Sequence, residues 1–289
     1  MQRHDTLFGL LVFSLPLLIG TACREEASSA PVATVAPSIA ERRMPERAEI
    51  DKVIRRIISY DGCRDLTAEM RLTSTDANGR RDQVQLRVER SFDEVAHRTF
   101  LQVVAPAEDA DKALLAVQST GQPTEAFSYL PGLRKLARLN SGRSLGFRGA
   151  RVTVQELLGL ELGQYDYEVE GPTDEAGTPG ISLLFTAKSE LGLAYPKIRA
   201  ILDGSTLLPL RFILIGTGGE IQKRIRVEKS EEIESRLTLS RFAIEDLTQQ
   251  LTLTLEMVKV DYDRGLKETA FTEERLKRTV SAAAAKGRE

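Results

Sequence analysis

The sequence predicts a mainly β protein, a half-open antiparallel β barrel with a few helices as a lid. After residue 60, apolar and polar residues alternate with the two-residue period of β-strands. Turn-forming residues separate these runs, and only one segment before residue 60 has the apolar spacing of an amphipathic helix. Because a wide sheet with one apolar face and few helices must curl to bury that face, we expect partial closure into a barrel.

The composition narrows the class of protein. The chain has 289 residues, 42% of them hydrophobic and 28% charged, which fits one large or two small folded domains. Lys and Arg total 40 and Asp and Glu total 42, giving a formal net charge of -2. A nucleic-acid-binding domain is usually strongly basic, so no nucleic-acid partner is expected.

The first 22 residues have the features of a signal peptide. Arg3 precedes an uncharged apolar run from Leu7 to Ile19, and small residues follow the run. At about 1.5 Å per residue the run is roughly 20 Å long as a helix, short of the ~30 Å hydrocarbon core of a bilayer. We therefore expect residues 1–22 to be removed.

The segment Gly20-Thr21-Ala22-Cys23 resembles a bacterial lipobox, which implies a diacylglyceryl group on Cys23 and anchoring to a membrane through that lipid. Glu25, two positions later, favours the periplasmic face of the outer membrane, with the inner membrane as an alternative. An ordinary secreted protein with a chance cysteine is the other reading. Cys63 would then be the only free thiol, and we expect it to pack as a small apolar side chain.

Residues 23–45 are predicted to be a flexible tether, because the stretch is rich in Ala, Ser, Pro and Thr and has no apolar periodicity. The folded domain is expected over residues 46–280, with a disordered tail at 281–289. It begins with one amphipathic helix, and a second short helical stretch is expected from Val152 to Leu160. The first helix has Ile50, Val53, Ile54, Ile57 and Ile58 on one face.

The first two strands form a predicted hairpin. Ala68, Met70 and Leu72 alternate with polar residues, as do Val84, Leu86 and Val88, and Asp76-Ala77-Asn78-Gly79 between them is typical of a turn. Further strands are predicted around 97–105, 112–119, 124–130, 134–139, 163–171, 180–188, 196–203, 207–215, 220–229, 236–245 and 249–262.

In the last predicted strand, the apolar positions change from one parity to the other after Met257. This change predicts a β-bulge, which would bend the strand. A barrel of this width can also leave an apolar cavity for a ligand. The residues expected to line that cavity are Met70, Leu72, Leu86, Val88, Leu101, Val103, Tyr129, Leu183, Phe185, Leu253 and Leu255.

Several motifs together resemble the outer-membrane lipoprotein-sorting-protein-like family. They are Tyr129-Leu130-Pro131, then Arg138, Gly142 to Ser144, Phe147-Arg148-Gly149 and Tyr165-Asp166-Tyr167. The resemblance covers roughly residues 65–278, and Ala150 departs from the family's usual Ser. It implies the fold of the periplasmic carriers LolA and LolB, whose cavity receives acyl chains of lipids or lipoproteins. By analogy it also implies an export pump of the resistance-nodulation-division type as a partner.

One catalytic sequence pattern occurs, but the His that it requires is not found after it. Gly142-Arg143-Ser144-Leu145-Gly146 matches the G-x-S-x-G pattern of esterases, which requires a His later in the chain. The only His after residue 22 is His97, which precedes Ser144. No spacing of His, Cys and carboxylates suggests a metal site. We expect no enzyme activity, no metal and no cofactor.

The stretch between Leu133 and Gln155 contains six basic residues and no acidic residue. It could dock anionic lipid headgroups or an acidic partner, or it could be a solvated loop. Its members are Arg134, Lys135, Arg138, Arg143, Arg148 and Arg151.

Three functions from different classes are compatible with these features. The first is a membrane-anchored lipoprotein that binds acyl chains and acts in outer-membrane lipoprotein sorting or lipid transport. The second is an accessory or sensor module of an export pump, without cargo transfer. The third is a structural lipoprotein whose barrel is filled by its own side chains.

Overall fold

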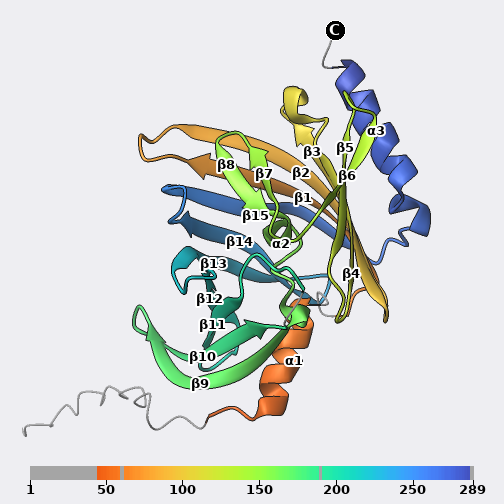
Figure 1. Cartoon of the computed structure of the whole chain (residues 1–289). Helices are drawn as coiled ribbons and strands as arrows, with labels where there is room; N and C mark the ends of the chain where they lie inside the picture. The colour runs from red at the N-terminus through yellow and green to blue at the C-terminus, as the bar shows by residue number, and fades with distance from the viewer. Residues whose placement is uncertain (1–43, 59–61, 189–190, 287–289) are drawn as a thin grey trace, which may run out of the picture. The chain divides into compact units, whose positions relative to one another are not determined.

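The computed structural model describes residues 44–58, 62–188 and 191–286, in which thirteen strands form one antiparallel sheet (Figure 1). Cys23, the expected signal peptide 1–22 and most of the expected tether 23–45 lie outside the described residues. The strands of this sheet are β1 Asp65–Thr75, β2 Arg81–Phe92, β3 Ala96–Ala105, β4 Ala113–Ser119, β5 Glu125–Leu130, β6 Lys135–Leu139, β9 Tyr165–Glu175, β10 Thr178–Ala187, β11 Lys197–Asp203, β12 Pro209–Ile215, β13 Ile221–Ile233, β14 Arg236–Asp246 and β15 Leu251–Tyr262.

The sheet curves but does not close. Its strand order is β6-β5-β4-β3-β2-β1-β15-β14-β13-β12-β11-β10-β9, so the first and last strands of the chain pair in the middle and β6 and β9 are the two edges. Leu66 of β1 lies opposite Tyr262 of β15. The mainly β, half-open barrel predicted from the sequence is confirmed.

The first hairpin has the predicted turn and register. Asp76 Oδ1 accepts hydrogen bonds from the backbone N–H groups of Asn78 (2.9 Å) and Arg80 (3.0 Å), and Gly79 has a positive φ of 78° that favours glycine. Met70 lies opposite Leu86 in the resulting ladder.

The predicted bulge in the last strand is also present. Glu69 lies opposite Lys259, but the next residue, Met70, lies opposite Met257, so Val258 has no partner in the ladder. Val258 is 51% exposed. The bulge therefore turns one apolar residue outward and places Val260 and Tyr262 on the same side of the strand as Met257.

The two faces of the sheet are covered by different elements (Figure 1). On the concave face, α1 Arg47–Ile58 buries Ile50, Val53 and Ile54, as its apolar spacing predicts. On the convex face, α3 Glu273–Lys286 buries Leu276 and Val280 against Phe100 and Leu115.

Helix α3 corrects one expected boundary. It continues to Lys286 and so includes part of the segment predicted as a disordered tail, 281–289. The physical reason is that four alanines, residues with the best helix propensity, follow the buried Val280. The guanidinium of Arg275 also holds the helix: it lies 4.0 Å from the Phe100 ring centroid and donates to Glu89 Oε2 at 2.6 Å and Oε1 at 2.8 Å.

The chain segment 140–164 connects the two edge strands across the concave face, and we call it the edge connection. It contains a separate hairpin, β7 Ser144–Phe147 and β8 Ala150–Thr153, then the short helix α2 Val154–Leu157 and a 3-10 turn, Leu162–Gln164. Phe147, Val152 and Leu158 are buried in the same apolar cluster as the strand residues Leu72 and Leu86. The edge connection thus acts as a cover for the concave face.

Candidate functional site

A cavity of about 250 Å³ lies between the concave face of the sheet and the edge connection. Strands β1–β3 and β12–β15 supply one wall, and the last residues of α1 and residues 157–164 supply the other. Ile57 and Ile58 close the α1 side. Of the side chains expected to line the cavity, six do so: Met70, Leu72, Leu86, Leu101, Leu253 and Leu255.

The other five expected residues lie elsewhere. Val88, Val103, Leu183 and Phe185 are buried in the same apolar cluster, but they do not line the cavity. Tyr129 lies on the opposite face of the sheet, in the cluster that α3 covers. On β5 the buried Ala126 faces the concave side, and Tyr129, an odd number of positions later, must face the other side.

Strand β14 supplies a set of lining residues that we did not predict, Leu237, Leu239, Phe242 and Ile244. Leu237 and Leu239 stand at odd positions and Phe242 and Ile244 at even positions, so a regular strand would point the two pairs to opposite sides. All four nevertheless line the cavity.

An irregularity in the pairing of β14 with β13 makes this possible. Ser240 is an extra residue on β14, because Arg241 lies opposite Lys229 and Leu239 opposite Ser230, and it reverses the side of the strand between Leu239 and Phe242. In the sequence, the apolar residues of this strand change from odd to even positions between Leu239 and Phe242. This change could have predicted the irregularity, as the change after Met257 predicted the bulge in the last strand.

The cavity also has a polar side. Arg90 is buried, lines the cavity and donates from Nη2 to the carbonyl oxygen of Leu157 in the edge connection at 2.8 Å. His97 lies beside it, with its ring 5.0 Å from that of Phe92 in an edge-to-face arrangement. Burial, and then the charge of Arg90, lower the pKa of His97, so the imidazole is neutral at neutral pH.

Glu161 is the most unusual residue of the cavity wall. It follows Gly159 and Leu160, and all three have left-handed φ angles, 84°, 67° and 54° in chain order. Its side chain is 5% exposed, and Oε1 accepts a hydrogen bond from the Thr124 hydroxyl. Burial raises the pKa of Glu161, and the neighbouring groups of Thr124, Ser141 and Gln118 offset this only in part.

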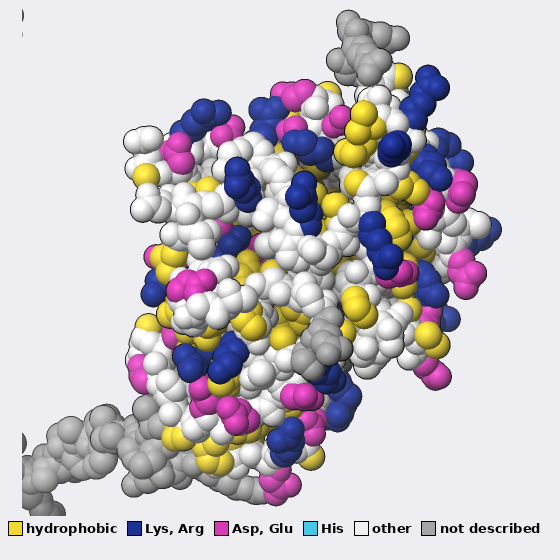
Figure 2. Space-filling model, viewed as in Figure 1, with side chains coloured by type: hydrophobic (Ala, Val, Ile, Leu, Met, Phe, Trp, Pro, Cys, Tyr) yellow, Lys and Arg dark blue, Asp and Glu magenta, His cyan; other side chains and the backbone are white. Residues whose placement is uncertain are grey.

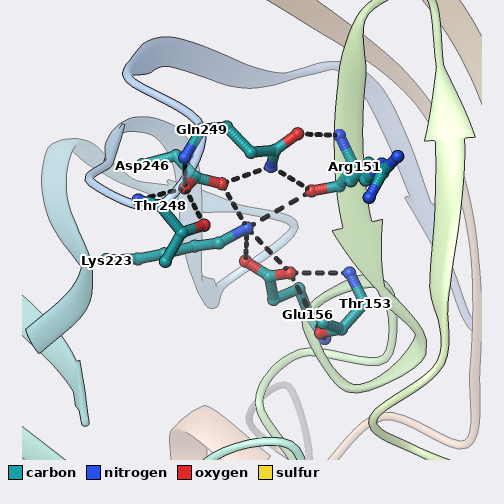
Figure 3. A network of polar contacts seen from close by, with 7 residues as sticks. All are labelled: Arg151, Thr153, Glu156, Lys223, Asp246, Thr248 and Gln249. Atoms are coloured by element: carbon teal, nitrogen blue, oxygen red, sulfur yellow. Dashed lines mark hydrogen bonds and ion pairs between the residues drawn. The ribbon is translucent and has the colours of Figure 1, made fainter. Parts of the chain in front are cut away.

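A buried ionic network fixes the edge connection to the sheet on one side (Figure 3). Lys223 Nζ of β13 lies 2.9 Å from Glu156 Oε1 and 2.8 Å from Asp246 Oδ2. Glu156 belongs to α2, where its carboxylate also accepts from the backbone N–H and hydroxyl of Thr153 in a capping box. Gln249 donates to the carbonyl of Arg151 at 2.8 Å and accepts from its N–H at 2.8 Å.

The β7–β8 hairpin is held on its other side by a second set of ion pairs. Arg148 Nε lies 2.8 Å from Asp109 Oδ2, and Arg148 also pairs with Glu108. Lys112 pairs with Asp109 at 2.7 Å and donates to the carbonyl of Gly146 at 3.2 Å. Although burial alone would raise it, hydrogen bonds from Lys112 and Arg148 hold the pKa of Asp109 below its usual value.

The six residues of the predicted basic surface separate into two groups. Arg148 and Arg138 have acidic partners outside the basic stretch, and Arg138 Nη2 lies 2.7 Å from Glu125 Oε1. Among the described residues, no ion pair is found for the exposed Arg134, Lys135, Arg143 and Arg151. Lys and Arg side chains are visible on the same face as exposed hydrophobic atoms (Figure 2).

Other candidate groups can be placed as well. Cys63 is buried, as expected, and burial raises the pKa of its thiol to about 12. Ser144 begins β7 with an exposed side chain. Within the described part of the chain, no three His, Cys, Asp or Glu side chains gather as a metal site would require, and no helix is long and apolar enough to cross a bilayer.

Comparisons with known proteins agree with this architecture. A family model described as "Uncharacterized protein" matches residues 96–278, which is more than half of the chain. Solved structures with the lipoprotein-sorting fold match as well. The chain belongs to the family of this model, and it has the LolA/LolB-like fold of these structures. The family resemblance expected from the sequence is therefore confirmed.

Three of these LolA-like structures cover most of the chain. An outer membrane lipoprotein-sorting protein domain from Vibrio parahaemolyticus is 18% identical, with a TM-score of 0.69, over 78% of this chain and 97% of that one. A DUF1329 family protein from Desulfovibrio piger is 19% identical, with a TM-score of 0.70, over 81% and 100%. A LolA superfamily protein from Nitrosomonas europaea is 15% identical, with a TM-score of 0.66, over 78% and 99%. No curated protein matches the sequence.

Proposed function

We propose that this LolA-like protein is a lipid-anchored lipoprotein of the periplasmic face of the outer membrane that holds an acyl chain in its cavity. The proposed role is in outer-membrane lipoprotein sorting or lipid transport, and no catalysis is involved. The observation that carries the proposal is the cavity, whose wall on β14 and β15 consists of apolar side chains such as Leu239, Phe242 and Leu255.

The size and energetics of the cavity suit one chain. Its volume of about 250 Å³ lies between the ~150 Å³ that hold one benzene ring and the ~300–1,000 Å³ of typical ligand pockets. Burying a fourteen-carbon chain at ~0.8 kcal/mol per CH₂ gives roughly 10 kcal/mol of gross transfer free energy. Ordering costs of about 2–4 kcal/mol leave about 6–8 kcal/mol, which corresponds to a dissociation constant of about 1–40 μM.

A soluble form that starts near Pro45 tests this proposal, because it keeps α1 and the whole sheet and lacks the signal, lipid and tether. We expect it to co-purify with an acyl lipid, identified by native mass spectrometry followed by lipid extraction. A folded protein that carries no lipid and does not bind fluorescent fatty acids would instead support a cavity without a ligand.

The fixed edge connection favours a second candidate, a sensor or accessory module of an export pump of the resistance-nodulation-division type. The buried Lys223 network and the Arg148 pairs hold the cover on both sides, which opposes rapid exchange of cargo. Transfer of a fluorescent lipid from donor to acceptor vesicles distinguishes the two candidates. A carrier accelerates this transfer, whereas a sensor binds the lipid without net transfer.

A further inference from the structure

The turn between β5 and β6 presents apolar side chains to solvent. Leu133 in the turn is 66% exposed, and Leu130, the last residue of β5, is 42% exposed. A single exposed leucine is common on protein surfaces, whereas two on one turn form an apolar patch that a partner can cover. We call residues 130–135 the β5–β6 tip.

The β5–β6 tip is held by the fold beneath it. The backbone N–H groups of Leu133 and Arg134 donate to carbonyl groups three residues earlier, at 3.1 and 3.3 Å. Immediately below the turn, Tyr129 lies opposite Leu136, and both pack against the apolar cluster that α3 covers. Because the tip is already ordered, little conformational freedom is lost when it binds a partner.

Two basic side chains lie directly beside the exposed leucines. Arg134 and Lys135 are both exposed, and no ion pair is found for either in the part of the chain that the structure describes. Lys135 lies opposite Leu130 in the pairing of β5 with β6. The tip therefore combines apolar side chains with positive charge.

The connection between β3 and β4, residues 106–112, lies at the same end of the sheet. Its acidic residues Glu108 and Asp109 pair with Arg148, and Asp109 also pairs with Lys112. This connection, Arg148 and the tip together contain four basic and three acidic side chains. The local charge is thus positive, although the formal net charge of the whole chain is -2.

The β5–β6 tip is remote from the cavity. The first residues of β4 lie toward the tip, and Gln118 and Thr120 at the other end of β4 line the cavity. The seven residues of β4 span roughly 20 Å at about 3.3 Å per residue. Figure 1 shows β5 and β6 beside α3, with α1 at the other end of the molecule. Over this part, hydrophobic atoms lie next to Lys and Arg atoms on the surface (Figure 2).

We propose that the β5–β6 tip docks on the surface of an anionic phospholipid bilayer, with its two leucines in the apolar layer and Arg134 and Lys135 at the headgroup phosphates. A bilayer offers these two chemistries in this order, and a surface that is both basic and apolar binds it through both. An acidic protein segment matches the charges alone. Only two of the six residues of the predicted basic surface belong to this tip.

The inference goes beyond the proposed function, because it does not depend on a ligand in the cavity. It adds a second membrane contact to the proposed lipid on Cys23. A contact through one rigid turn also gives the folded domain a preferred orientation on the surface.

The position of the tip can be measured with one introduced indole, because the chain contains no Trp. The full chain carrying Leu133→Trp is added to vesicles of phosphatidylcholine, with or without phosphatidylglycerol, that contain a brominated lipid as a quencher. Val258→Trp is the matched control, since Val258 is 51% exposed at the bulge of β15. Fluorescence is divided by the amount of protein bound to the vesicles.

With phosphatidylglycerol present, we expect the indole of Leu133→Trp to shift to shorter wavelength and to be quenched by the brominated lipid. The indole of Val258→Trp should emit as it does in water. Adding Arg134→Gln and Lys135→Gln to Leu133→Trp should lower the ratio of docked to free tips roughly twentyfold, because each basic group near an anionic surface contributes about fivefold.

The same basic stretch offers a control for the loss of two charges. Arg143 and Arg151 are exposed and lie outside the tip, so Arg143→Gln combined with Arg151→Gln should leave the quenching in Leu133→Trp unchanged. An equal loss in both double variants would show that total charge, and not the tip, binds the membrane, and would overturn the proposal.

Three further outcomes would also overturn it. The first is an indole at position 133 that stays in water with every vesicle composition, which would leave an acidic protein as the partner. The second is equal quenching with and without phosphatidylglycerol. The third is a shift to shorter wavelength before vesicles are added, which would mean that a second copy of the chain covers the tip. Lipid retained in the cavity is measured separately by native mass spectrometry, so each of these failures leaves the proposed acyl binding intact.

Discussion

Lys223 Nζ lies 2.8 Å from Asp246 Oδ2, and the two side chains are 4% and 0% exposed. This pair is the centre of the network that holds α2 against β13 and the turn after β14 (Figure 3). Although burial alone would raise it, hydrogen bonds from Lys223 and Thr248 hold the pKa of Asp246 below its usual value. The carboxylate is thus charged at neutral pH and depends on Lys223 for compensation.

Replacing Lys223 with Met should lower the free energy of unfolding by about 3–5 kcal/mol, because it leaves buried carboxylates without their cation. Arg224→Met on the same strand is the matched control. Its ion pair with Glu245 is 36% and 54% exposed, and its removal should cost at most about 1 kcal/mol. Urea denaturation followed by circular dichroism measures both. Similar losses in the two variants would show that the buried network contributes little.

Glu161→Gln should change the dependence of stability on pH. The pKa of Glu161 is raised in the folded state, so its contribution is fully present below the ordinary value of 4.5 and is lost as pH rises through the folded-state pKa. The Gln variant cannot ionise. It should therefore match the unaltered protein near pH 4 and exceed its stability at pH 8 by about 1–3 kcal/mol.

Thermal melts across this pH range measure the difference between the two proteins. A constant difference between pH 4 and pH 8 would mean that Glu161 titrates normally. Glu245→Gln serves as the control for a more exposed carboxylate on the sheet.

Leu255→Trp should reduce the room for a ligand without adding a charge. Leu255 lines the cavity, and a larger ring there would overlap with a bound chain. Overpacking of this kind costs about 1–3 kcal/mol, so the affinity for the chain should fall roughly tenfold. Thr254→Trp, on the other face of the same strand, is the control. The lipid retained by each purified variant is counted by native mass spectrometry. Equal retention would place the lipid outside this cavity.

Cys23→Ser should abolish membrane association. An acyl anchor contributes about 0.8 kcal/mol per buried CH₂, and a serine hydroxyl cannot form the thioether that attaches it. Membrane fractionation combined with intact mass measurement tests the change. If the serine variant were still cleaved and firmly bound to the membrane, the anchor would have to be another part of the protein.

Ser144→Ala should leave lipid binding and any cellular activity unchanged. Ser144 has an exposed side chain at the start of β7, and no His, the residue that activates the Ser of the esterase pattern, follows it in the sequence. Hydrolysis of short esters by the purified protein, lost on this substitution, would contradict the non-enzymatic function.

Local patterns were sufficient for most of the fold. The alternation at Met70 and Leu72, the turn from Asp76 to Gly79 and the parity change at Met257 each depend on neighbouring residues, and each predicted the observed structure. Helix α3 was missed because only Leu276 and Val280 face the sheet, too few apolar positions for a clear helical period.

The candidate site was predicted less completely, because its parts come from distant segments. Glu156, Lys223 and Asp246 meet only after the edge connection folds over the sheet, and no local spacing relates them. Glu161 did have a signal, since it is a single acidic residue in the apolar run from Leu157 to Leu162. Its burial and its hydrogen bond from Thr124, which is 37 positions away in the sequence, are visible only in the structure.

The central pairing of β1 with β15 has a consequence for chain connectivity. If Tyr262 were joined to Asp65 and the chain were opened within 140–164, every strand of the sheet would follow its spatial neighbour, giving a simple meander. The natural order of the sequence is thus a circular permutation of that meander. In such a meander, the edge strands β6 and β9 would carry the free ends of the chain. In this protein the sheet is the same, but the edge connection joins these two strands, and it carries both Glu156 and Glu161.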